Sequence, residues 1–443
     1  RIASPHLISS LDDLRTLSED FRSWGLNYKL TQDIDASDTA NWNNGKGLSP
    51  IGTQVIPFTG TFDGNGHSII GLTIQRPQQN EVGLFGYNSG EISSLRLLDA
   101  NVRGNNQTGA LVGFNESTVR DVVSSGQVRG NLFVGGLIGE VAVNGYVASS
   151  ASHASVVGTE RIGGLIGRHE GIVIDAYSTG DLSAGGTVGG LVGGFSGENA
   201  LIDRAYSTSD LTTTRLDMDT GGLIGLLGDN DSSQGGGVAR DSYYSQDTVG
   251  VDFELASADN YSISINRLSA AAIRAASGIG ADPDWDINGE SSEWAQLDVN
   301  NMQANGKFYR STPYLRILNH DEPGAEPASL PIPGLVEMPQ PPSIAESNTE
   351  FLDGDLVIAF TPSTSTADAT ITGYDYSLDN GQTWQSSGQT SSPIVIDGLD
   401  SAGVYQIRLR AQTNMGPGPR SSVYRLAGSS LIFQDRFQVI EAN

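Results

Sequence analysis

Apolar residues in the first half of the chain recur in one short phrase, in which glycines flank an aliphatic pair. The six copies are VGLFG at 82–86, TGALVG at 108–113, VGGLIG at 134–139, IGGLIG at 162–167, VGGLVG at 188–193 and TGGLIG at 220–225. Their leucines follow one another at intervals of 27, 26, 28, 26 and 32 residues. Such a period is typical of repeat proteins, whose units bury their apolar faces only by stacking. The pattern predicts an all-β fold whose main part is a single-chain parallel β-solenoid.

A strand-like segment follows each phrase, and a few more precede the first one. The expected strands are 28–34, 58–62, 67–74, 95–102, 119–128, 147–156, 173–182, 202–211 and 239–249, with a tight turn at 63–66. About eight coils fit between Tyr28 and Gly250, and a spacing of ~4.8 Å between parallel coils gives a rod of roughly 40 Å. The phrase glycines are expected to accept a positive φ at a sharp corner and to leave no Cβ that would collide with the next coil.

Both ends of the solenoid carry segments that look like caps. Residues 7–21 have apolar side chains at helical spacing, with Ser9 or Ser10 as the N-cap, and predict a helix over the first coil. Residues 269–277 predict a second helix at the far end, and the aromatic-rich stretch 285–315 completes that cap. Irregular insertions are expected at 212–220 and 229–237, where the solenoid would carry protrusions.

The pattern changes after a proline-rich stretch that holds seven of the 17 prolines. Alternating strands at 356–360, 371–378, 394–396 and 404–411, with a hairpin turn at 379–381, indicate a small β-sandwich. The expected division is 1–27 capping helix region, 28–261 solenoid, 262–319 C-terminal cap, 320–342 linker, 343–427 sandwich and 428–443 tail.

Composition narrows the possible partners. The chain has 51 acidic and 25 basic residues, a formal charge of −26, which argues against direct binding to nucleic acid or to an anionic membrane. It has no cysteine, hence no disulfide or thiolate site, and no apolar run of membrane-spanning length. The charge favours solubility in a salty or cation-rich medium. The chain starts at Arg1 without a visible signal peptide and is interpreted as a processed piece of a longer protein.

The solenoid segment resembles the GLUG-repeat domains of bacterial surface adhesins over residues 20–318. Besides the glycine phrases, the likeness is carried by YKLTQDIDA at 28–36, FTGTFDGNGHSIIGLT at 58–73, DAYSTGD at 175–181, WDI at 285–287 and TPYLR at 312–316. The resemblance implies a right-handed β-helix of the haemagglutinin type, displayed outside the cell. Ala110 and the degenerate coil at 147–156 depart from the family pattern, so irregular coils are expected there.

Residues 343–427 resemble a fibronectin type III module. GYDYSLDNGQTW at 373–384 and YQIRLRAQTNMGPG at 405–418 carry this second likeness. It implies a spacer module of the kind found in secreted bacterial proteins.

Four aspartates at comparable places in their coils are the first candidates for chemistry: Asp121, Asp175, Asp203 and Asp241. If Asp175 and Asp203 stacked in register, their carboxylates would lie ~5 Å apart, where they could share a cation or a proton or act as a retaining glycosidase pair. Asp203 precedes its tyrosine by three residues and Asp175 by two, which makes the register doubtful. A structural ladder is favoured over a bound cation, and both over catalysis.

The remaining polar candidates also favour structural roles. Asp282, Asp284 and Asp286 lack the glycine that an EF-hand loop requires, and Asp217, Asp219, Asp229 and Asp231 leave open a loosely held Ca²⁺ in the irregular loops. His67 is expected to hydrogen-bond at the 63–66 turn, and none of the histidines has metal-ligand spacing. Arg161 and Arg168 flank one glycine phrase, but no acidic cluster that would suit a polysaccharide lyase is visible beside them.

Aromatic residues offer one further kind of site. Trp42 and Phe58 could stack on sugars, whereas Trp384 is expected in the core of the sandwich. The sequence therefore predicts a non-catalytic, extracellular bacterial surface protein without catalytic, cofactor-binding or metal residues. We expect it to contact a host or abiotic surface, a glycan or neighbouring subunits. Two alternatives stay open: a fibre subunit that assembles through edge strands or the tail at 429–443, and a carbohydrate-active β-helix enzyme.

Overall fold

The computed structural model describes residues 4–214, 220–228, 236–245, 261–268, 294–295, 308–310, 314–315, 336–352 and 354–427. The chain divides into two compact units, each described by itself below. The first comprises Arg1–Ala295 with Tyr314–His320, and the second comprises Gln296–Pro313 with Asp321–Asn443. The expected helix at 269–277, the acidic loops with Asp217, Asp219, Asp229, Asp231, Asp282, Asp284 and Asp286, and the tail lie outside the described residues.

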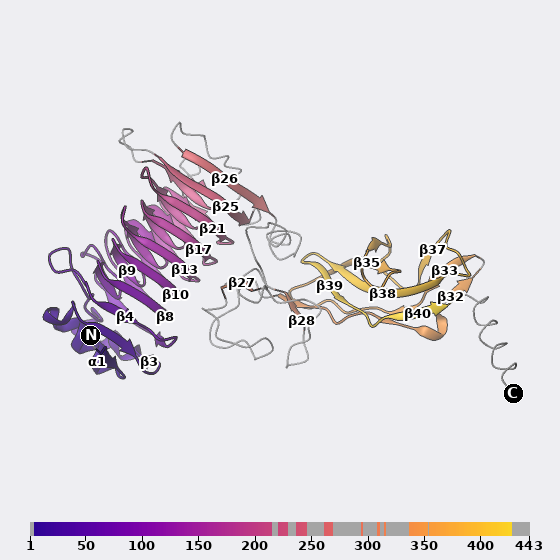
Figure 1. The fold of residues 1–443 in the computed structure, drawn as a ribbon, viewed down its shortest axis with the longest axis horizontal. Coiled ribbons are helices and arrows are strands. Elements are labelled where there is room, and N and C mark those ends of the chain that lie inside the picture. The colour runs from indigo at the N-terminus through magenta and orange to yellow at the C-terminus, as the bar shows by residue number, and fades with distance from the viewer. Residues whose placement is uncertain are drawn as a thin grey trace. The chain divides into compact units, whose positions relative to one another are not determined.

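The first unit is a parallel β-solenoid with three sheets (Figure 1). The largest sheet, sheet A, follows the path β1 (His6–Ile8), β2 (Asn27–Leu30), β4 (Thr61–Asp63), β8 (Glu91–Arg103), β10 (Thr118–Arg129), β13 (Tyr146–Ser152), β17 (Ile172–Ser178), β21 (Leu201–Ser207), β25 (Gly237–Ser245) and β26 (Tyr261–Leu268). Off this path it also contains β3 (Ile34–Asp35), β5 (Ser68–Ile70), β6 (Thr73–Gln75), β14 (Ser155–Gly158), β18 (Leu182–Ala184) and β22 (Leu211–Thr213).

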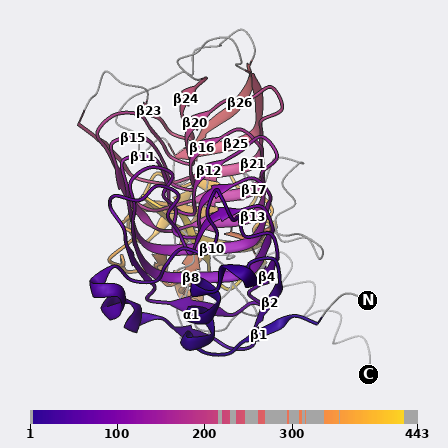
Figure 2. The same ribbon diagram turned by 90° about the vertical axis from the view of Figure 1, so that its left-hand side faces the viewer.

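Two smaller sheets complete the coils, and both are visible in Figure 2. Sheet B contains β7 (Phe85–Asn88), β9 (Val112–Asn115), β12 (Ile138–Val141), β16 (Ile166–His169), β20 (Val192–Phe195) and β24 (Ile224–Leu227). Sheet C contains β11 (Leu132–Gly135), β15 (Glu160–Gly163), β19 (Val188–Gly189) and β23 (Thr220–Gly221). Sheet B has six strands, one in each coil that carries a phrase. The described residues thus form about six turns that carry a phrase, while the path of sheet A passes through eight strands from β2 to β25, in the range for which about eight coils were predicted.

The phrase glycines were expected to adopt a positive φ and to leave no room for a Cβ, and the first of these expectations is not met. None of the phrase glycines has a positive φ. The left-handed residue of the corner lies just before the phrase and carries a side chain in four coils: Glu81 (φ 55°), Gln107 (φ 47°), Phe133 (φ 58°) and Arg161 (φ 55°). The corner therefore turns at a non-glycine residue, and the expectation of a positive φ at the phrase glycines was wrong.

The other expectation, that a Cβ would not fit, agrees with the geometry. A Cβ added to Gly163 would lie 1.9 Å from the carbonyl oxygen of Ile166, and one on Gly189 would lie 2.0 Å from that of Val192. The leucine of each of the six phrases is buried in the interior. The glycines are needed because backbone from the same and the neighbouring coil occupies the space that a side chain would fill.

The N-terminal cap is shorter than predicted. Helix α1 spans Leu11–Glu19, and Ser10 caps it by accepting a hydrogen bond from the backbone N–H of Asp13. Leu14 and Leu17 are buried against the first coils, and the 3-10 turns η1 (Phe21–Ser23) and η2 (Ser37–Gly45) follow. Ile8 belongs to β1 instead of the helix, so the cap begins with a strand that extends sheet A.

The strands predicted in the repeats are present, and the coil at 147–156 is regular. Its strands β13 and β14 pair in register with β10 on one side and with β17 and β18 on the other.

Farther along, β27 (Trp294–Ala295) pairs with β29 (Tyr314–Leu315) in the first unit.

The second unit is an antiparallel β module. Its strands are β28 (Phe308–Arg310), β30 (Val336–Met338), β31 (Ser343–Ile344), β32 (Glu350–Leu352), β33 (Asp355–Ile358), β34 (Phe360–Thr361), β35 (Ile371–Ser377), β36 (Gln385–Ser386), β37 (Ile394–Ile396), β38 (Val404–Thr413), β39 (Gly416–Arg420) and β40 (Tyr424–Ala427), with a 3-10 turn η5 (Glu346–Asn348). One core joins residues of β33 and β37 to residues of β35 and β38. The hairpin predicted at 379–381 connects β35 to β36, with Asn380 at φ 65°.

Candidate functional site

The aspartates that the sequence singled out lie at a corner of sheet A. One residue in each coil adopts a left-handed conformation there: Ser94, Asp121, Ser149, Asp175, Arg204 and Asp241, with φ between 45° and 57°. In the ladder between β17 and β21, Ile174 pairs with Asp203 and Ala176 with Ala205, so Arg204 lies beside Asp175. The stacked carboxylate pair considered for Asp175 and Asp203 is therefore not formed, because the two residues are one position out of register.

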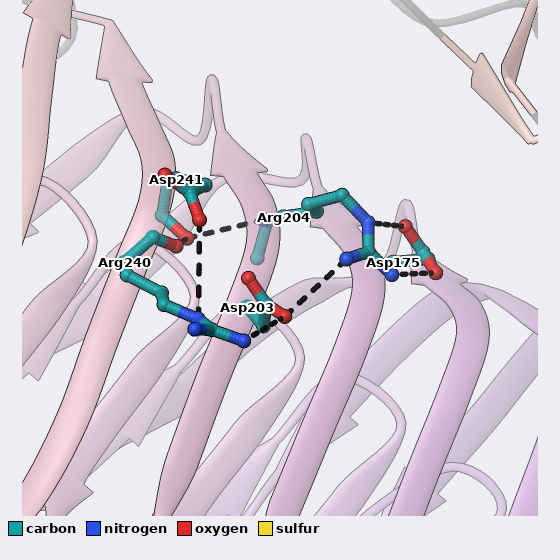
Figure 3. A network of polar contacts seen from close by, with 7 residues as sticks. Asp175, Asp203, Arg204, Arg240 and Asp241 are labelled. Atoms are coloured by element: carbon teal, nitrogen blue, oxygen red, sulfur yellow. Dashed lines mark hydrogen bonds and ion pairs between the residues drawn. The ribbon is translucent and has the colours of Figure 1, made fainter. Parts of the chain in front are cut away.

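Arg204 neutralises both of these carboxylates (Figure 3). Its Nε and Nη2 donate to Oδ1 and Oδ2 of Asp175, each at 2.8 Å, a bidentate pair. Its Nη1 donates to Oδ2 of Asp203 at 3.3 Å. Asp175 and Asp203 are largely buried, with side-chain exposures of 13% and 5%. The arginine thus compensates charge that would otherwise be costly to bury.

Arg240 extends the network by one more coil (Figure 3). Its Nη2 donates to Oδ2 of Asp203 at 3.1 Å, and its Nε lies 3.9 Å from Oδ2 of Asp241. Oδ1 of Asp203 is buried without a hydrogen-bond partner in the described structure. A similar arrangement holds Asp121, whose Oδ2 accepts from Arg120 at 2.7 Å, while Arg120 also binds Glu91 from the preceding coil.

These contacts make the corner a chain of ion pairs across coils. A general acid or nucleophile needs a carboxyl group that substrate can reach, whereas the two central carboxylates here face guanidinium groups inside the corner. The arrangement suits the structural ladder better than a glycosidase pair. Aligning the repeats on Ala-Tyr-Ser (176–178 and 205–207) would have placed Arg204 opposite Asp175 from sequence alone.

A second charged cluster lies on the outer side of sheet B. Arg168 donates to Oε1 of Glu140 at 2.8 Å and also binds Glu170, two single carboxylates that the sequence analysis did not place beside it. The guanidinium carbons of Arg161 and Arg168 lie 5.3 and 5.5 Å from the ring centre of Phe133. Both arginines are thus held by internal contacts.

Neighbouring coils continue this cluster with aromatic and acidic residues. The rings of Tyr87 and Phe114 stack at 4.7 Å across adjacent strands, so each ring covers a face of the other. Burial, and then the hydrogen bond from its hydroxyl to Glu116, raise the pKa of Tyr87 to about 12. Burial, and then the carboxylate of Glu140, raise the pKa of Glu81. Rings that cover each other are a poor platform for a sugar.

The interior side of sheet B holds a polar ladder that the sequence analysis missed. Nδ2 of Asn88 donates to Oδ1 of Asn115 at 2.7 Å, and both residues are fully buried. Two coils further, His169 occupies the same column, with Nε2 3.1 Å from the carbonyl oxygen of Leu201 and its ring stacked 5.7 Å from Phe195. Burial lowers the pKa of His169 to about 4, which keeps the ring neutral. The signal was present in the sequence, as an Asn that follows the first two glycine phrases at the same distance.

The remaining sequence candidates have structural surroundings. Phe58 is fully buried and packs on Phe85, so its proposed role in sugar stacking was wrong. Trp42 is half-buried with the guanidinium of Arg15 4.9 Å from its ring. Trp384 is also half-buried and lies under Arg410 at 4.3 Å, outside the core in which it was expected.

His67 forms the predicted hydrogen bond at the 63–66 turn through its backbone, whose N–H donates to the carbonyl oxygen of Gly64 at 2.8 Å. Its Nδ1 lies 3.4 Å from Oδ1 of Asp33, which precedes the 63–66 turn by one coil. Over the residues that the structure describes, no three His, Asp or Glu side chains gather closely enough to hold a metal ion. The helices of those same residues include none with the length and apolar character needed to cross a membrane.

The parallel sheets and the ion pairs at the corner of sheet A place the first unit in the class of parallel β-solenoids whose coils are linked by ion pairs. No protein-family model matches the chain. It is 35% identical over 196 residues to halomucin of Haloquadratum walsbyi, a match that covers 43% of this chain and 2% of halomucin. It is 28% identical over 224 residues to the immunoglobulin A1 protease of Streptococcus sanguinis, covering 47% of this chain and 12% of that protein. The chain thus spans only a small fraction of these relatives.

A solved structure supports the fold. The crystal structure of a putative immunoglobulin A1 protease from Bacteroides ovatus aligns with a TM-score of 0.50 at 20% identity. The alignment covers 71% of this chain and 93% of that one. At this identity the likeness shows the fold alone.

Proposed function

We propose that the chain is a non-catalytic segment of an extracellular surface protein and acts by contact, as an adhesin or display segment. The observation that carries the proposal is the corner of sheet A, where the carboxylates best placed for chemistry, Asp175 and Asp203, are bound by Arg204. What the solenoid offers to partners is then its long, regular outer surface.

The comparisons are compatible with this proposal. Halomucin and the immunoglobulin A1 protease are both far longer than the segment that matches, which fits a chain that is one part of a larger product. The proposal extends to the finer features inferred from resemblance: GLUG-type coils with a right-handed turn, a fibronectin type III-like second unit, and a location outside the cell or on its surface. Its partners would be a host or abiotic surface, a glycan or a neighbouring subunit.

A second candidate is an accessory, non-catalytic part of a large secreted enzyme. The two matches to immunoglobulin A1 proteases favour it. In that case the solenoid would hold a substrate or position a catalytic part located elsewhere in the product. This candidate differs from the first in requiring a defined soluble protein ligand.

Binding and turnover measured on the same glycans and cells test the proposal. The full chain is expected to bind without forming any product, and Asp175→Asn with Asp203→Asn is expected to leave binding unchanged. A glycan product that forms with the parent chain and disappears in this double variant would refute the non-catalytic assignment. Selective binding to one soluble protein substrate would favour the second candidate.

A further inference from the structure

One outer face of the solenoid has an uneven distribution of charge. Six strand segments lie side by side there: β6, the C-terminal halves of β8 and β10, β14, β18 and β22. In each segment one apolar residue points inward, so the residues directly before and after it point to solvent. The inward residues are Ile74, Val102, Val128, Val156, Leu182 and Leu211. We call the solvent side of these six segments the lateral face.

Two arginines lie next to each other on one half of the lateral face. Arg103 on β8 and Arg129 on β10 are register neighbours, and both are exposed. The residues that flank them on the face are amides, Asn101 and Gln127, and Arg129 donates to Gln127 at 3.1 Å. Neither arginine has an ion pair with a carboxylate in the described part of the chain.

Two aspartates lie next to each other on the other half. Asp181 precedes β18 and Asp210 precedes β22, and the backbone N–H of Leu182 bonds to the carbonyl of Asp210, which sets them side by side. Both aspartates are exposed. The pKa of Asp210 is raised, first by partial desolvation of its carboxyl group and then by the negative charge of Asp181. Like charges on adjacent strands destabilise a sheet. Each half of the face therefore carries a like-charge pair that the described residues do not compensate.

The strand between the two halves is neutral. β14 presents Ser155 and Val157, and Val157 is 43% exposed. The strands follow one another in the order β8, β10, β14, β18 and β22. The arginines lie on the two strands before β14, and the aspartates lie at the two strands after it. The charge pattern is thus antisymmetric about β14.

A surface with this pattern is complementary to itself. A two-fold axis along β14 would bring β10 of one copy opposite β18 of a second, and β8 opposite β22, with the solenoids antiparallel. Long arginine side chains can reach carboxylates one column away on the facing sheet. We propose that two copies of this chain pair through the lateral face, with Arg103 and Arg129 of each copy against Asp181 and Asp210 of the other and Val157 at the centre.

The dimensions of the face indicate weak pairing. Six strands at ~4.8 Å and three residues at ~3.3 Å cover about 300 Å² per copy, well below the roughly 800 Å² per partner of a stable complex. The pairing is therefore expected to be effective only at high concentration of the chain. The overall charge of −26 does not prevent it, because at 0.1 M salt charges beyond about 10 Å are screened and the local pattern decides. This inference stands independently of the proposed adhesive role.

A charge exchange tests the pairing in the full chain. Variant one carries Arg103→Glu and Arg129→Glu, which makes its lateral face acidic, and variant two carries Asp181→Arg and Asp210→Arg, which makes it basic. Self-association is followed by light scattering and sedimentation over rising concentration in 0.1 M salt. Each variant alone is expected to associate at least about tenfold more weakly than the parent chain, and an equimolar mixture is expected to recover or exceed the parent's association.

Matched controls separate the face from net charge. Arg22→Glu with Arg425→Glu, and Asp38→Arg with Asp397→Arg, change the charge by the same amounts at exposed positions elsewhere and are expected to associate like the parent. Circular dichroism checks that each variant is folded.

Three results would overturn the proposal: a parent chain that stays monomeric at the highest concentration, a mixture that fails to associate, or controls that weaken association equally. If the parent stays monomeric and only variant one loses binding to heparin, the arginine pair serves an anionic polysaccharide instead.

Discussion

The spacing of the coils depends on phrase glycines whose Cβ position is already filled, and Gly163→Ala tests this directly. The added Cβ would lie 1.9 Å from the carbonyl oxygen of Ile166 and 2.8 Å from the amide nitrogen of Gly193. Both neighbours are backbone atoms, so no rotamer change can relieve the contact. Because φ at Gly163 is not positive, an alanine there adds no backbone strain of its own.

The expected loss in the free energy of unfolding follows from these contacts. Overpacking a well-packed site costs typically 1–3 kcal/mol, and a collision with fixed backbone belongs at about 3 kcal/mol. A Gly→Ala change also lowers the conformational entropy of the unfolded chain, which offsets about 0.4–1 kcal/mol of this loss. The net prediction is a loss of about 2 kcal/mol or more.

Gly194→Ala provides a matched control in the same solenoid. The nearest atom to its added Cβ is Cδ of Arg161 at 3.2 Å, the far part of a flexible side chain. This variant is expected to change stability by less than about 1 kcal/mol in either direction. Urea unfolding followed by far-UV circular dichroism compares the two midpoints. If Gly163→Ala is as stable as Gly194→Ala, the steric explanation of the phrase glycines fails.

Three further predictions concern the polar groups between coils. The pKa of His169 is lowered from 6.5 to about 4, so its stabilising contribution is complete above pH 6.5 and is lost as the pH falls toward 4, by about 2 kcal/mol at pH 5. Urea midpoints at pH 7 and 5 should show a smaller shift in His169→Phe, and an equal shift in both proteins would contradict the assignment. Asn115→Ala should cost about 2 kcal/mol, since it removes buried hydrogen bonds, and an unchanged midpoint would argue against the interior ladder. A double-mutant cycle on Asp175 and Arg204 should give a coupling of about 1 kcal/mol, whereas a coupling near zero would mean that the bidentate pair does not stabilise the corner.

Much of the solenoid could be predicted because its determinants repeat. Each glycine phrase has the same steric requirement. The period of the phrases therefore predicted that the coils stack, that their leucines are buried and that the strands of sheet A follow them. The phrases alone mark only six coils, because the early strands β2 and β4 of sheet A lack a glycine phrase. Which residue turns the corner could not be read from composition, since Glu81, Gln107, Phe133 and Arg161 share a left-handed φ and little else.

The corner site illustrates a different limit. A shift of one position between two strands decides whether Asp175 meets Asp203 or Arg204, and the sequence specifies that position only when the repeats are aligned on Ala-Tyr-Ser instead of on the aspartates. Likewise, Trp384 lies outside the core with Arg410 of β38 over its ring, a contact between distant residues that no local pattern encodes. Side-chain partners across coils follow from register, which a sequence specifies only indirectly.

The central functional claim is that the outer surface of the solenoid makes the contact, without a catalytic carboxylate pair. The most direct measurement is binding to the same immobilised cells or glycans by the full chain, by a chain without residues 28–315, and by the Asp175→Asn, Asp203→Asn variant. We expect the deletion to reduce binding to background and the double variant to bind like the parent. Binding that persists after the deletion would contradict the claim.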